Sequence, residues 1–287
     1  MDGRVIAFAL SVLGVGAQAP APAPPLVQTD RSPRPGVGDL LVAPQRLILE
    51  GGTRSGELFL QNTGPRTATY RVSFIQMAMG EDGALRELEA KAPGGKYADE
   101  IVRFSPRQVT LEPGATQTLR VSLRLPEALP PGEYRSHLVF RAVPEAEPVR
   151  SGDAEEAPAQ GIAVRLTPIY GVAIPVIVRH GATAASVAWA SAAYRPGEPG
   201  TVEATLARSG NQSLYGNLVA TFHPAGGAEP VIVSRMTMAA VYDGLPRRRF
   251  TFPLNLPQGL PARGTLHLAF LHPDTGSALA ETRLELR

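Results

Sequence analysis

The chain has 287 residues and no cysteine. This absence excludes a disulfide framework, a thiolate nucleophile, an iron–sulfur cluster and a zinc site with cysteine ligands. Lysine is nearly absent as well, because the basic side chains are arginines apart from Lys91 and Lys96. The 28 basic and 26 acidic residues leave a net charge of +2. So even a balance excludes a nucleic-acid partner held by phosphate neutralisation.

The motifs of common enzyme classes are also missing. There is no HExxH zinc motif and no GxSxG nucleophile elbow. The GGK at 94–96 departs from a Walker loop, since Ala90 replaces the first glycine and Tyr97 replaces the Ser or Thr. His267, His272 and Asp274 lie near one another in sequence but are read as ordinary surface residues. The sequence therefore predicts no enzyme, no catalytic residue, no metal and no cofactor.

The N-terminus is typical of an export signal. Arg4 precedes an apolar stretch at 5–15, and the small residues at 15–17 resemble a signal-peptidase site. Cleavage after Ala17 is expected, which would make 1–17 a signal peptide of an exported protein; a buried first strand is the alternative. The stretch is too short to span a bilayer and no later run of 18 apolar residues exists, so no membrane insertion is expected. Residues 18–38 are rich in Ala and Pro and are interpreted as a linker.

From residue 39 onward apolar side chains recur with a period of two, which is typical of half-buried strands. The clearest alternation is in TATYRVSF at 67–74 and TLRVSLRL at 118–125. Strand signals separated by Gly- and Pro-containing turns recur seven times on each side of a break near 180–181. We therefore predict an all-β protein of two tandem immunoglobulin-like β-sandwich domains, at 39–180 and 181–287. The best helix candidate, Ala84–Lys91, is short.

Two charged clusters have simple structural interpretations. Glu81 and Asp82 precede Gly83 and are typical of a solvated turn. The three arginines at 247–249 open a strand and are read as an exposed edge protected by charge.

The last strand of the first domain is unusually long. In GIAVRLTPIYGVAIPVIVRHG (161–181) every second residue from Ile162 to Val178 is apolar or Pro, over about 17 residues, whereas strands usually have 5–6. Pro168 and Pro175 favour an edge position, because proline donates no ladder hydrogen bond. An exposed apolar edge would be an aggregation hazard unless it docks a partner. The alternative is a core strand of an ordinary sandwich that continues across the domain junction.

Five segments follow one another between about residues 40 and 179: APQRLILEGG, LFLQNTG, FSPRQVTLEPGATQTLRV, LPPGEYRSHLVFRAVP and the long strand ending in IPVIVR. In the order and spacing of these segments the sequence resembles the periplasmic pilus-assembly chaperones of the chaperone/usher pathway, the PapD-like family, as a divergent member. This resemblance implies two immunoglobulin-like domains and an ATP-independent chaperone that lends its long edge strand to an incomplete pilin-like subunit, with an outer-membrane usher as a further possible partner.

The resemblance also implies site residues. Ile162, Val164 and Leu166 match the alternating residues of the donor strand. Arg46 matches the first-strand arginine that helps to anchor the carboxylate of the subunit's C-terminus. The family's second anchor is a lysine, and Pro175 stands at that position here.

Two functions follow from these observations. The first is a periplasmic chaperone that binds pilus or fimbrial subunits by donor-strand complementation. The second is an envelope scaffold or adhesion module that has a chaperone-like fold but does not lend a strand, and the missing lysine favours it.

Overall fold

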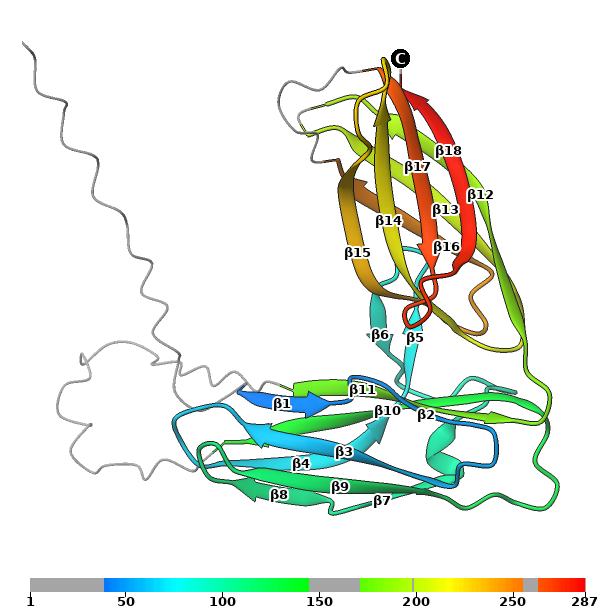
Figure 1. The fold of residues 1–287 in the computed structure, drawn as a ribbon. Helices are drawn as coiled ribbons and strands as arrows, with labels where there is room; N and C mark the ends of the chain where they lie inside the picture. The colour runs from blue at the N-terminus through cyan, green and yellow to red at the C-terminus, as the bar shows by residue number, and fades with distance from the viewer. Residues whose placement is uncertain (1–38, 145–170, 198, 255–262, 287) are drawn as a thin grey trace, which may run out of the picture. The chain divides into compact units, whose positions relative to one another are not determined.

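The alternating segments form strands, and their apolar residues point inward. In a computed structural model, which describes residues 39–144, 171–197, 199–254 and 263–286, Tyr70 and Val72 are buried while Arg71 between them is exposed. Leu119 and Val121 are fully buried in the same way. The fold class is confirmed: the described residues form an all-β protein with two sandwiches (Figure 1).

The first sandwich consists of two packed sheets of four and five strands. One sheet has the order β1-β3-β9-β7 and the other β2-β11-β10-β4-β8. Their bounds are β1 (Leu40–Ala43), β2 (Leu47–Leu49), β3 (Ser55–Asn62), β4 (Ala68–Ile75), β7 (Val102–Ser105), β8 (Gln108–Leu111), β9 (Thr116–Leu123), β10 (Gly132–Val143) and β11 (Gly171–His180).

The chain changes sheets between β1 and β2. The first strand, β1, pairs antiparallel with β3 at the edge of one sheet, whereas β2 pairs parallel with β11 at the edge of the other. Only three residues of β11 have a partner in β2, namely Val176, Ile177 and Val178. The short β2 therefore covers one end of β11 and leaves the remainder of that side without a described partner strand.

The second sandwich has sheets of three and four strands, in the orders β12-β13-β16 and β15-β14-β17-β18. Three buried phenylalanines, Phe222, Phe250 and Phe270, belong to its core. The bounds are β12 (Ala185–Arg195), β13 (Thr201–Gly210), β14 (Leu214–Pro224), β15 (Val231–Val241), β16 (Arg247–Pro253), β17 (Gly264–Leu271) and β18 (Ala278–Leu286).

The best helix candidate, Ala84–Lys91, does not form a helix. Part of this segment is β6 (Leu85–Glu87), which forms a hairpin with β5 (Met77–Met79), and the helix within the described residues is one short turn, η1 (Ala98–Glu100). Because the Gly80–Gly83 turn brings β5 and β6 together, antiparallel pairing replaces the helix.

This hairpin connects the sandwiches, which belong to one unit of the chain. Met79 packs against the core of the second sandwich. At the hairpin tip, the backbone N–H of Arg249 donates to the carbonyl of Glu81 at 2.6 Å, and the two side chains lie 3.6 Å apart as an ion pair. The two charged clusters interpreted separately from the sequence thus meet, and the tip covers the start of the edge strand β16.

Candidate functional site

The open side of β11 is the first candidate site. From Gly171 to Pro175 the strand pairs with β10 on one side, and no strand among the described residues pairs with its other side. Backbone N–H and C=O groups on such an edge can accept an added strand. The predicted donor residues Ile162, Val164 and Leu166 lie outside the described residues, as do the predicted signal peptide and linker.

The described part of the long strand is a core strand on its inner face. Ile174, Val176 and Val178 are buried in the first sandwich, and Val172 packs against the same cluster. On the other face Ala173 is exposed, whereas Ile177 is fully buried in a small cluster with residues of the second sandwich. Within the described residues, β11 thus has an unpaired side up to Pro175 while its inner face is buried along the strand; the interpretation as a donor strand depends on 162–166 and stays a prediction.

Arg46 lies in the bend between β1 and β2 rather than within a strand. Its guanidinium lies 3.6 Å from the centre of the Tyr215 ring, so the half-buried side chain stacks on the second sandwich. Burial raises the pKa of Tyr215 well above its usual value, because the phenolate would lose its hydration. The contact of Arg46 is thus a cation–π contact with a neutral ring.

Pro175 directly precedes the part of β11 that pairs with β2, which begins with Val176 opposite Leu47. On the other side of β11, Pro175 is opposite His137 of β10. The position where the resemblance expects a second cation is therefore occupied by a ring without charge, opposite a buried histidine.

Glu133 is the centre of a polar network between the two sandwiches. Its side chain is fully buried, and it accepts hydrogen bonds from the backbone N–H of Ser213 at 2.8 Å and from the Ser213 hydroxyl. Arg135 and Arg179 form ion pairs with it at 3.3 and 3.4 Å. A buried carboxylate needs such compensation, because its desolvation is costly.

Further contacts extend this network. Arg179 also forms an ion pair with Glu50 at 2.8 Å and donates to the carbonyl of Ser213 at 3.1 Å. The backbone N–H of Asp243 donates to the Ser213 hydroxyl at 2.9 Å. The network thus links β10 and β11 of the first sandwich to two turns of the second. We call this contact region the joint. It extends in space from Glu133 on β10 to Tyr242 in the turn after β15.

Aromatic rings form the other part of the joint. The Arg135 guanidinium lies 3.8 Å from the centre of the Tyr242 ring, and the Tyr242 and Tyr215 rings are 6.3 Å apart. The Tyr242 hydroxyl is hydrogen-bonded to Nε2 of His137 at 3.2 Å. Burial, together with the nearby Arg135 charge, lowers the pKa of His137 to about 4. His137 is therefore neutral at neutral pH.

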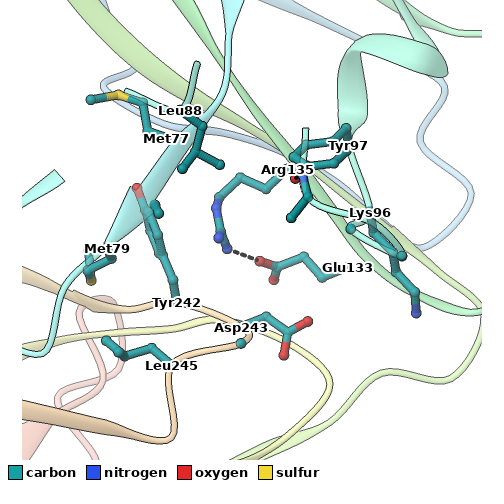
Figure 2. Close-up of a pocket in the computed structure, with 15 residues that line it drawn as sticks. Met77, Met79, Leu88, Lys96, Tyr97, Glu133, Arg135, Tyr242, Asp243 and Leu245 are labelled. Atoms are coloured by element: carbon teal, nitrogen blue, oxygen red, sulfur yellow. Dashed lines mark hydrogen bonds and ion pairs between the residues drawn. The ribbon is translucent and has the colours of Figure 1, made fainter. Parts of the chain in front are cut away.

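A cavity of about 430 Å³ lies beside the joint. Figure 2 shows Glu133 and Arg135 pointing toward one another in its lining, with Tyr242 and Asp243 contributed by the turn after β15. The remainder of the lining includes apolar side chains of β5 and the segment around Lys96. The lining combines an ion pair that is already satisfied with apolar surface, and it contains no nucleophile paired with a base.

Within the described ranges no group of three or more His, Asp or Glu side chains is placed to hold a metal ion. None of the helices in those ranges is long and apolar enough to cross a membrane.

Sequence reasoning missed the joint. Glu133 and Ser213 are 80 residues apart, and neither belongs to a recognisable motif. One signal was available: Glu133 and Arg135 are charged residues in a strand that continues into the apolar run Leu138–Phe140, and charged residues in a buried strand are unusual unless they are paired.

Comparison with known proteins gave matches only among solved structures. No known family model matches the chain, and no curated protein matches its sequence. The CsuC–CsuE chaperone–tip adhesion subunit complex of Acinetobacter baumannii is 14% identical, with a TM-score of 0.42 over 86% of this chain and 98% of that chain.

Two further structures match over similar lengths. The CupB2 chaperone of Pseudomonas aeruginosa is 10% identical, with a TM-score of 0.39 over 86% of this chain and 99% of that chain. The Salmonella enterica SafA pilin in complex with the SafB chaperone gives 16% identity and a TM-score of 0.40 over 86% and 96%. The likeness is to the class of protein that the sequence resembles, and at these identities it concerns the fold alone.

Proposed function

We propose that this chain is a periplasmic, ATP-independent chaperone that binds a pilin-like subunit by lending it a strand. The observation that supports this is the edge of β11 from Gly171 to Pro175, which has no described partner strand. This edge continues directly from the segment that contains Ile162, Val164 and Leu166. A subunit that lacks a strand would pair its backbone with this segment and take the alternate side chains into its groove.

The energetics favour such a contact. Each fully buried Val, Ile or Leu side chain contributes about 1.5–3 kcal/mol before the costs of association are subtracted. The inner face of β11 beyond Val172 is fixed in the core of the first sandwich. A strand held at one end loses less conformational entropy when its partner arrives than a free strand would.

The remaining parts of the chain have expected roles in this proposal. Residues 1–17 would be a signal peptide cleaved near Ala17, and 18–38 a linker. Residues 39–180 would be the domain that lends the strand, 181–287 would complete the chaperone, and an outer-membrane usher would receive the loaded complex. Arg46 would contribute to anchoring the subunit's carboxyl terminus.

Co-expression with candidate subunits tests this proposal. The variant Ile162→Asp/Val164→Asp/Leu166→Asp should capture at least ten-fold less subunit, because three charges would enter an apolar groove. The matched control places aspartate on the other face, as Ala163→Asp/Thr167→Asp, and should capture nearly as much as the unmodified protein. Equal capture by the triple variant would contradict the proposal.

A second candidate function is an envelope scaffold or adhesion module with the same fold. Pro175 favours this candidate, because proline stands where the resemblance expects a lysine and offers no second cation for a carboxylate. A protein that captures no subunit and remains in a stable assembly with envelope components would support it.

A further inference from the structure

His137 occupies an unusual position in the joint. Its side chain is almost completely buried, with 1% of the residue exposed, and it contacts the second sandwich through Tyr242. Its other ring nitrogen, Nδ1, is buried and has no hydrogen-bond partner among the described residues. A neutral imidazole can leave one nitrogen without a proton, whereas a protonated ring has two N–H donors to satisfy.

The groups around His137 make an added positive charge unfavourable. From its own strand come Glu133 and Arg135, whereas the neighbouring strands offer Ile75 and Pro175 at the paired positions, which carry no charge. The other ionisable groups of the joint are Arg46 before β2, Arg179 on β11, Tyr215 on β14, and Tyr242 and Asp243 after β15.

The carboxylate at the centre of the joint does not compensate for this charge. Glu133 already accepts from Arg135, Arg179 and Ser213, and His137 is not among its hydrogen-bond or ion-pair partners in the described residues. A protonated His137 would therefore be a further cation near Arg135, on a ring that has almost no access to water. It would gain hydration only if Tyr242 moved away from β10.

We propose that His137 makes the joint acid-sensitive: its protonation separates Tyr242 from β10 and loosens the contact between the sandwiches while each sandwich keeps its fold. This proposal stands apart from subunit binding, because it concerns a contact within the chain. Low pH would act on the joint first, since the cores of both sandwiches are built from apolar side chains.

Distance measurements between two spin labels test this directly. The absence of cysteine allows a label pair to be introduced cleanly, for example Gln117→Cys on β9 and Ala193→Cys on β12, both at exposed positions. We expect one narrow distance distribution at neutral pH and a second, broader population that becomes dominant near pH 4. Its midpoint should coincide with the titration of His137 followed by NMR. The fluorescence of the single tryptophan, Trp189, should report that the second sandwich stays folded.

Variants separate His137 from other acid effects. The His137→Phe variant should keep the narrow distribution down to about pH 3.5, because no proton can bind at this position. If circular dichroism shows that His137→Phe does not fold, His137→Gln takes its place. The His180→Gln control should behave like the parent. A parent distribution that does not change with pH, or the same transition in the His137 variant, would overturn the proposal.

Discussion

The two halves of β11 differ although they belong to one continuous strand. From Gly171 to Pro175 it has one partner strand among the described residues, and Ala173 faces solvent. From Val176 to Val178 it has partners on both sides and is buried on both faces. The buried half holds the open half in place, so an edge can be offered to a partner without loss of order in the strand.

The difference also separates stability from binding. Substitutions in the buried half should change the free energy of unfolding, whereas a substitution of the outward-facing Ala173 in the open half should mainly change what the edge can bind.

Aspartate substitutions test the two halves directly. Val176 is fully buried, so Val176→Asp should lower the free energy of unfolding by more than about 4 kcal/mol, because it buries a carboxylate without a partner. The matched variant Ala173→Asp should cost less than about 1 kcal/mol. Urea denaturation measures both. Similar losses for the two variants would mean that the halves do not differ.

Removal of the Glu133 side chain should weaken the joint, which lies next to the buried half of β11. The Glu133→Ala variant should lose about 3–5 kcal/mol, because Arg135 and Arg179 would be left without their buried carboxylate. The control is Glu57→Ala, which breaks an exposed ion pair with Arg120 and should cost about 0–1 kcal/mol. Urea midpoints that are equal for the two variants would contradict a stabilising role of Glu133.

Low pH should reduce the free energy of unfolding through His137, which lies opposite Pro175 at the boundary between the two halves of β11. The pKa of His137 in the folded protein, about 4, is lower than its usual value of 6.5, so the unfolded chain binds the proton more readily. The stability from neutral His137 is fully present above about pH 6.5 and is lost as pH falls toward 4, by up to about 3 kcal/mol.

The measurement is the free energy of unfolding at several pH values. Carboxylates also titrate in part of this range, so the informative quantity is the difference between the parent and His137→Phe. Parallel curves for the two proteins would show that His137 does not contribute.

The smallest expected effect concerns Arg46, at the same boundary. Removal of its cation–π contact in Arg46→Ala should cost about 0.5–2 kcal/mol in urea denaturation. If Arg46 contacts only Tyr215, subunit capture should fall no more than this loss of stability explains. A loss of capture with unchanged stability would instead assign it to the binding of the partner.

Much of the fold could be predicted from the sequence, because a period of two over eight residues, as in β4 and β9, is a strong local signal. The hairpin of β5 and β6 was missed, since three-residue strands are too short to show a period. The joint depends on contacts between distant residues such as Glu133 and Ser213, which local patterns do not encode. Arg46 was selected by resemblance, and its ring partner Tyr215 had no sequence signal.

The short strand β2 has a consequence for anything that docks on β11. A polypeptide that pairs with the open side of β11 from Gly171 onward meets β2 at Val176, because Leu47, the first residue of β2, is already paired there. The added strand cannot pair with β11 beyond this point. The length of the added strand is limited at that point. The three residues of β2 thus limit how many residues of an incoming chain can pair with β11.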